Sequence, residues 1–128
     1  QVSAEPVLAI DATVALSDIS LDLADAVASM APFGEGNPEP VFRIDGLSVS
    51  AMHIGRPVPK GLRLAISDGA GTTAEGLWFG HPEFLGLFSR PCKWSLAATL
   101  STDYHSGARE VRLRVIDAME SNAEWSAQ

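Results

Sequence analysis

The sequence predicts a mainly β domain: a five-stranded Greek-key barrel of the OB-fold type, with a short helix between strands 3 and 4 and a strand-helix segment before the barrel. Three stretches of alternating apolar and polar residues, a short helical stretch and two more alternating stretches follow one another between residues 41 and 118. This is the element order of an OB-fold. A five-stranded sandwich would contain similar elements, so the order alone leaves both architectures open.

The first 40 residues form a head in front of the barrel. Residues 6–16 are rich in Val, Ile and Leu without helical spacing, which predicts a strand or a buried extended run. Ser20 can cap a helix over about residues 21–31, whose acidic residues we interpret as a solvated outer face. Spacings of four and three give the helix an apolar face made of Leu23, Val27 and Met30.

A Pro- and Gly-rich segment ends this helix. Three prolines and two glycines fall within residues 32–40, which predicts a rigid, kinked connection, because Pro removes backbone donors and Gly permits positive φ. The Gly-x-Gly triplet at residues 34–36 follows a helix and precedes prolines, so we interpret it as a structural junction and not as a phosphate-binding loop. We therefore expect a head over residues 1–40, a barrel over 41–118 and an acidic tail over 119–128.

Period-two alternation predicts the first three barrel strands. Residues 41–54 read as one long strand whose alternation shifts by one step at Asp45-Gly46, as at a β-bulge. Residues 61–67 alternate regularly, and the turn sequence SDGAGT leads to a third strand over 72–79. We expect the second strand to direct three apolar side chains into the core, Leu62, Leu64 and Ile66.

A short helix and two strands complete the pattern. Residues 80–90 carry Pro82 at the first helical turn, and we interpret His81 as a helix-start residue. Alternation predicts further strands over 93–100 and 109–117, joined by a turn-forming stretch. We expect Cys92 to be a packed thiol outside the strands. The aromatic residues expected in the core are Trp78, Phe79 and Trp94.

Charge, cysteine and hydropathy exclude several classes of protein. The formal net charge of −7 argues at first against nucleic-acid binding, but residues 1–42 contribute −7, residues 43–116 contribute +3 and the last twelve contribute −3. A single cysteine forms no internal disulfide, and the three histidines are far apart, without CxxC zinc spacing. No signal-like or membrane-length apolar run occurs, so we expect a soluble, cytoplasmic protein without a membrane partner.

Basic and aromatic residues gather in two predicted loops and on the strands beside them. In an OB-fold the loop between strands 1 and 2 (L12, residues 53–60 here) and the loop between strands 4 and 5 (L45, residues 101–109) converge on one binding edge. Single-stranded DNA requires basic side chains along its phosphates and aromatic rings that stack on its bases, although polar loops and solvated strand arginines occur in any protein. The candidate DNA-binding residues are Arg56, Lys60, Arg63, Tyr104, Arg109 and Arg112, with His53 and His105 in the same loops.

The junction itself carries a family resemblance. Residues 31–42, APFGEGNPEPVF, resemble the segment that joins the catalytic core to the OB domain in bacterial RecJ, the single-strand-specific 5'-to-3' DNA exonuclease. Residues 6–30 resemble the stretch before that segment, and residues 109–118 resemble the last barrel strand of the family. The resemblance implies that the chain, which begins with Gln1 and not with Met, is a piece from the C-terminal half of a RecJ-like nuclease, with its head at the end of the catalytic-core region.

The resemblance also implies what the chain should lack. RecJ-type enzymes cleave DNA with divalent metals held by a DHH-type cluster and helped by a GGH motif, and neither Asp-His-His nor Gly-Gly-His occurs here. We therefore expect no catalytic and no metal-binding residue in this chain, with Mg²⁺ or Mn²⁺ in the absent catalytic core. The implied function is a non-catalytic domain that assists single-stranded DNA binding in repair and recombination. The alternative is a protein-interaction or architectural module that packs on the nuclease core or binds a repair partner.

Overall fold

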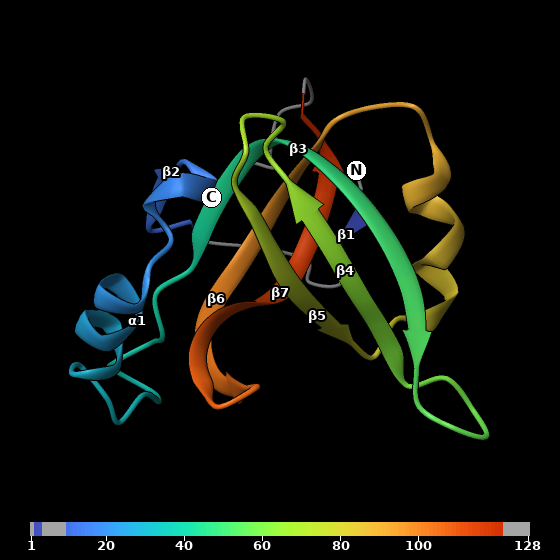
Figure 1. The fold of residues 1–128 in the computed structure, drawn as a ribbon. Helices are drawn as coiled ribbons and strands as arrows, with labels where there is room; N and C mark the ends of the chain where they lie inside the picture. Colours follow the sequence, from blue (N-terminus) through green and yellow to red (C-terminus); the bar gives the residue numbers. More distant parts are fainter. Residues whose placement is uncertain (1, 4–9, 122–128) are drawn as a thin grey trace.

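Five long strands pair in a closed ring in the computed structural model, which describes residues 2–3 and 10–121 (Figure 1). The ring order is β3-β4-β5-β7-β6, and β6 closes it by pairing with both β7 and β3. The pairing of β5 with β7 is parallel, and the other four are antiparallel. Closure confirms the predicted OB-fold barrel over the sandwich. The strands are β3 (Phe42–Ile54), β4 (Gly61–Ser67), β5 (Thr73–Phe79), β6 (Trp94–His105) and β7 (Ala108–Glu120).

A bulge in β3 allows this one strand to serve two neighbours. The pairing of β3 with β6 shifts register between Ile44 and Leu47, and Gly46 adopts φ +71 there, a value that suits glycine. β3 pairs with β6 as far as Leu47, just beyond the bulge, and from Ser48 onward it pairs with β4. The predicted bulge at Asp45-Gly46 is therefore confirmed, and it bends the strand around the barrel.

The barrel interior is filled by apolar side chains from every strand of the ring and closed at one end by η2 (Pro82–Ser89). Trp78 and Trp94 are each 1% exposed, and Phe88 of η2 packs its ring 5.1 Å from that of Trp94. The predicted short helix is present, but as a 3₁₀ helix, and His81 occupies its N-cap as expected. Cys92 is partly buried, and this burial, together with the nearby Glu120, raises the pKa of its thiol.

Two side chains predicted to be buried are exposed instead. Phe79 is 53% exposed, because it follows Trp78 in a strand and successive strand residues face opposite sides of the sheet. Met30 is 50% exposed, because the helix ends before it reaches that residue. In its place Ala24 joins Val27 on the buried face of the helix.

The head packs on one side of the barrel, away from η2 (Figure 1). Strand β2 (Ala12–Val14) pairs in parallel with the start of β3, and a 3₁₀ turn, η1 (Leu16–Asp18), leads to α1 (Leu21–Ala28). The predicted cap is present, since the backbone N–H of Leu23 donates to Oγ of Ser20 over 3.1 Å. A short strand, β1 (Val2–Ser3), pairs with β7, while residues 6–9 of the predicted first run and 122–128 of the predicted tail lie outside the described residues.

The junction after α1 is held by one amide side chain. Nδ2 of Asn37 donates to the carbonyl oxygens of Met30 and Pro32 at 2.9 and 2.8 Å, and Gly34 and Asn37 form a backbone bridge. These bonds make the Pro- and Gly-rich segment the rigid connection that its composition predicts. No helix in the described part of the chain is long and apolar enough to cross a membrane.

The close approach of β4 to β5 at Gly61 yields a stability prediction. A Cβ at this position would lie 2.6 Å from the carbonyl oxygen of Trp78 and 2.8 Å from Cα of Phe79, and both are backbone atoms that cannot move alone. We expect Gly61→Ala to lower the free energy of unfolding by about 1–3 kcal/mol, as overpacking does. Urea unfolding followed by tryptophan fluorescence measures this. Gly86→Ala is the control, since a Cβ there meets no heavy atom within 4 Å, and an equal loss in both variants would contradict the explanation.

Candidate functional site

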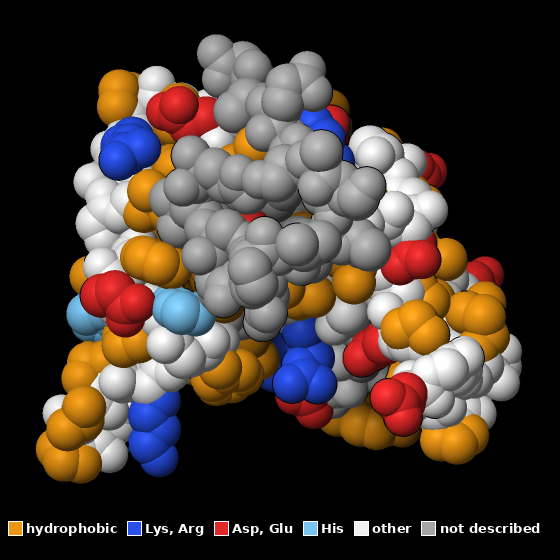
Figure 2. Space-filling view, turned by 180° about the vertical axis from the view of Figure 1, so that it is seen from behind, with side chains coloured by type: hydrophobic (Ala, Val, Ile, Leu, Met, Phe, Trp, Pro, Cys, Tyr) orange, Lys and Arg blue, Asp and Glu red, His pale blue; other side chains and the backbone are white. Residues whose placement is uncertain are grey.

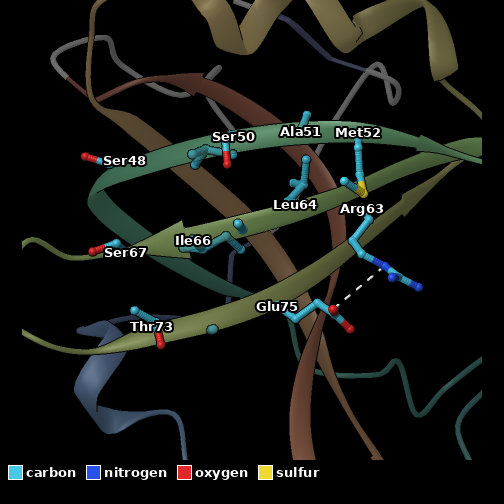
Figure 3. Close-up of a pocket in the computed structure, with 13 residues that line it drawn as sticks. Ser48, Ser50, Ala51, Met52, Arg63, Leu64, Ile66, Ser67, Thr73 and Glu75 are labelled. Carbon is cyan, nitrogen blue, oxygen red and sulfur yellow. Dashed lines mark ion pairs between the residues drawn. The ribbon is translucent and has the colours of Figure 1, made fainter.

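A groove runs over the outward face of β3, β4 and β5, with a volume of about 620 Å³ (Figure 3). The strand register aligns its outward side chains in rows across the three strands. One row consists of Ser48, Ser67 and Thr73, the next of Ser50, Ala65 and Glu75, and the third of Met52, Arg63 and Leu77. The side chains on the floor of the groove are thus small and uncharged near the β4–β5 turn. Toward L12 they are larger, and both apolar and charged side chains occur among them.

A chain of ion pairs crosses the charged part of this face. Oε2 of Glu75 lies 3.7 Å from Nε of Arg63, and Oε1 of Glu75 lies 2.7 Å from Nε of Arg112. Arg112 also contacts Asp103 at 2.7 Å. The structure therefore brings two of the six candidate residues, Arg63 and Arg112, together around one carboxylate.

Arg112 is the more constrained of these two arginines. Its side chain is 19% exposed, and β7 places it directly opposite Glu75 in the ladder with β5. The side chain of Arg63 is 48% exposed and holds Glu75 at the longer distance. Arg63 can therefore turn toward a phosphate at lower cost than Arg112, because a long exposed ion pair contributes little stability.

L12 projects from the barrel as a separate basic feature. Its ends are tied together, since the N–H of Lys60 donates to the carbonyl of Ile54 at 2.7 Å and the N–H of Gly80 donates to the carbonyl of Lys60 at 2.9 Å. Arg56 and Lys60 are both exposed, and within the described residues no carboxylate lies at ion-pair distance from either. The opposite view shows L12 as a protrusion carrying apolar and basic side chains at the lower left (Figure 2).

The predicted L45 loop is wrong as a loop. Strand β6 continues to His105, only Ser106 and Gly107 form the turn, and β7 begins at Ala108, so residues 101–109 are mostly a β-ribbon. The alternating polar and β-favouring residues of this stretch pair across the two strands. The prediction of a loop relied on the turn-forming residues and did not take this pairing into account.

The ribbon separates the remaining candidates from the groove. Tyr104 pairs with Arg109 in the ladder, one step out of phase with the Asp103 and Arg112 side chains, so the two lie on the opposite face of the ribbon. There Arg109 contacts Asp25 of α1 at 2.5 Å, and this hydrogen bond and the charge of Asp25 raise the pKa of Arg109. Tyr104 is 72% exposed. The six candidates therefore do not form one continuous surface.

Histidines and metal ligands add little to this site. Nε2 of His53 lies 2.9 Å from the carbonyl oxygen of Pro82, which ties the end of β3 to η2. Between residues 10 and 121, and in the two residues of β1, no group of three or more His, Cys, Asp or Glu is placed to hold a metal ion. The described residues therefore do not fit a divalent metal site.

Sequence reasoning did not select two residues of the outward face as candidates. Phe79 lies in the same strand-face series as Glu75 and Leu77, and Arg114 pairs with Leu77 across the β5–β7 ladder. Arg114 is exposed, and no ion pair is formed by it within the described chain. The signal was present, because a buried Trp78 requires an outward Phe79 under period-two alternation.

Comparison with known proteins gives a consistent result. The family described as the RecJ OB domain matches residues 10–117. A crystal structure of RecJ with Mn²⁺ from Thermus thermophilus is similar at 26% identity and a TM-score of 0.53, over 80% of this chain and 15% of that one. The structure of RecJ with Mg²⁺ from the same organism gives 25% identity and 0.54, over 79% and 15%. The chain thus spans about 15% of the length of those proteins, and no curated protein matches it.

The contact of Arg109 with Asp25 yields a testable consequence for the head. We expect a double-mutant cycle with Asp25→Asn and Arg109→Gln to give a favourable coupling for unfolding, because the pair joins α1 to the β6–β7 ribbon. The coupling should fall when salt is raised to about 1 M, where charges are screened within about 3 Å. Urea unfolding at both salt concentrations measures it. A coupling of zero at low salt would show that the pair does not hold the head.

Proposed function

The chain belongs to the RecJ OB domain family, and from this premise we propose that it helps to hold single-stranded DNA for the nuclease of which it forms a part. The activity of the longer protein, a metal-dependent 5'-to-3' exonuclease acting in DNA repair and recombination in the cytoplasm, is part of the same proposal. In this role the domain binds and guides the strand and leaves hydrolysis to a catalytic core in the same chain.

The observation that supports this role is the position of the groove. OB-folds bind oligonucleotides on the face of their second and third strands and at the adjoining loops. These strands are β4 and β5 here, and the groove of about 620 Å³ lies over them and β3. Arg63 lies in the groove, while the exposed Arg56 and Lys60 lie in L12 at its end. A strand in the groove would meet basic side chains along its phosphates.

Electrostatics predicts weak binding by this domain alone. Glu75 and Asp103 neutralise part of the basic surface, because Arg63 and Arg112 contact them. The net charge of −7 adds a long-range repulsion for an anionic ligand. A phosphate must therefore compete for arginines that are already paired, and affinity should fall steeply with salt.

The divalent metal belongs to another part of this proposal. We place Mg²⁺ or Mn²⁺ in the catalytic core, outside the described residues, which do not fit a metal site. The two similar Thermus structures are described as complexes with Mn²⁺ and Mg²⁺. No step of the DNA-holding role requires a metal ion in this domain.

A second candidate function has its own observation. The end of the groove at the β4–β5 turn is lined by small uncharged side chains, with no aromatic residue for base stacking. A peptide of a repair partner, or the nuclease core, fits such a floor as well as DNA does. This candidate is a protein-interaction or architectural module, and it is favoured if the folded domain fails to bind DNA.

The first test removes one cation of the groove and one cation of L12. We expect Arg56→Gln with Arg63→Gln to weaken binding of a fluorescent oligothymidine at low salt by about tenfold, because two phosphate contacts are lost. Each lost contact should also reduce the slope of log affinity against log salt concentration by about 0.7. Fluorescence anisotropy over a salt series measures both effects. The control is Arg90→Gln, which removes an exposed charge after η2. Unchanged binding in the double variant, or no binding by the folded wild type, would refute the DNA-holding role.

The second test concerns Glu75, the carboxylate between the two arginines. We expect Glu75→Gln to tighten oligothymidine binding by about threefold or more, because it frees Arg63, leaves Arg112 with Asp103 as its one carboxylate partner among the described residues, and removes a negative charge from the groove. Glu83→Gln makes the same change of net charge on η2, where its partner is His81. If both variants tightened binding equally, the effect would come from net charge and not from the groove.

A further inference from the structure

An apolar patch adjoins L12 on the outward face of the sheet. Its members are the outward side chains near the ends of β3 and β5, namely Met52, Leu77 and Phe79. Two of them are more than half exposed, Met52 at 58% and Phe79 at 53%, and so is Val58 of L12 at 68%. Exposed apolar side chains gathered in one place indicate a contact surface more often than isolated ones do. We call this group the L12 patch.

Phe79 is the aromatic member of the L12 patch, and its neighbour leaves its ring open. Its cross-strand partner is Gly61, which has no side chain to cover the ring. A larger residue cannot take that place without strain, because even a Cβ would lie 2.6 Å from the carbonyl oxygen of Trp78. The close approach of β4 to β5 therefore requires glycine at the position beside Phe79, and no side chain covers the Phe79 ring from there.

The backbone that carries Phe79 is held from both sides. Trp78 is buried, with its ring 5.2 Å from that of Phe84 and 6.1 Å from that of Phe88 in η2. The N–H of Gly80 donates to the carbonyl of Lys60 at 2.9 Å, which ties the end of β5 to L12. An exposed ring on a fixed backbone loses little conformational entropy when a ligand covers it.

Basic side chains surround the L12 patch. Arg63 lies between Met52 and Leu77 in the register, Arg114 is paired with Leu77 in the next strand, and the backbone carbonyl of Lys60 accepts from the N–H of Gly80. Of these, Arg114 and Lys60 have no carboxylate at ion-pair distance within the described residues. An open aromatic ring among unneutralised cations matches a ligand that has flat apolar faces and a polyanionic backbone. Unpaired bases on a phosphate chain have both properties.

We propose that Phe79 stacks on an unpaired base of single-stranded DNA, with Lys60 and Arg114 on the adjacent phosphates. This deepens the proposed function and rests on it. The stacking residue is thus Phe79 on the groove side, and not Tyr104 on the far face of the β6–β7 ribbon. Such a contact selects against duplex DNA, whose base faces are already covered by neighbouring bases.

The test compares the binding of an oligonucleotide that has bases with the binding of one that lacks them. We expect Phe79→Ala to weaken binding of a labelled oligothymidine by about tenfold, within the range of base-aromatic stacking, and Phe79→Trp to retain it. An abasic oligonucleotide of equal length should bind the wild type and Phe79→Ala equally, because it has phosphates but no base to stack. Met30→Ala is the control, since it removes another half-exposed apolar side chain from the head. Fluorescence anisotropy at low salt measures each affinity.

Each other outcome has a defined meaning. If Phe79→Ala binds oligothymidine like the wild type while Arg56→Gln with Arg63→Gln weakens it, stacking by Phe79 is refuted and the DNA-holding role stands. If the wild type binds no oligonucleotide, the proposed function itself fails. If Phe79→Ala weakens the abasic ligand equally, Phe79 acts through the shape of L12 and the stacking proposal is wrong. Should Phe79→Ala unfold, Phe79→Leu keeps the apolar volume without the aromatic face and must show the same tenfold loss.

Discussion

The bulge in β3 is the constraint on which the barrel depends. Without the bend at Asp45-Gly46, one straight strand could not pair with β6 through its first residues and with β4 through its last. Polar groups stabilise the bend: Oδ1 of Asp45 accepts from Nε of Arg43 and from Oγ of the buried Ser95, at 2.8 and 2.5 Å. The N–H of Gly46, which is left outside the ladder, donates to Oγ of Ser121 at 2.9 Å. The backbone opened by the bulge is thus supplied with partners from elsewhere in the barrel.

The candidate site is a consequence of this bend. The second half of β3 continues away from β6 and forms, with β4 and β5, a sheet whose inner side covers the tryptophan core and whose outer side is the groove. Because the inner side is filled, each outward side chain has a set direction. The rows of side chains across the three strands therefore follow from the register alone.

Charge is balanced locally and not over the whole chain. The acidic head does not only add negative charge, since its Asp25 contacts Arg109 and so neutralises one basic side chain of the β6–β7 ribbon. Within the groove Glu75 has a similar effect on Arg63 and Arg112. Among the six candidate residues, Arg56 and Lys60 of L12 have no carboxylate at ion-pair distance within the described residues, and the exposed Val58 lies in the same loop.

The residues alone predicted the chain order of the strands, the bulge, the capped helix, the junction and the family resemblance, because these depend on local pattern: period two, a cap residue, and Gly and Pro at particular positions. It also contained the direction of Phe79, through its place next to Trp78. It could not show that residues 101–109 form a ribbon, since the same residues favour turns and paired strands. Which cations lack an ion-pair partner can be seen only in the folded chain, because an arginine is neutralised by residues from other elements, as Arg109 is by Asp25 and Arg63 by Glu75. Free charge and exposed surface are properties of packing between distant segments, and local pattern does not record them.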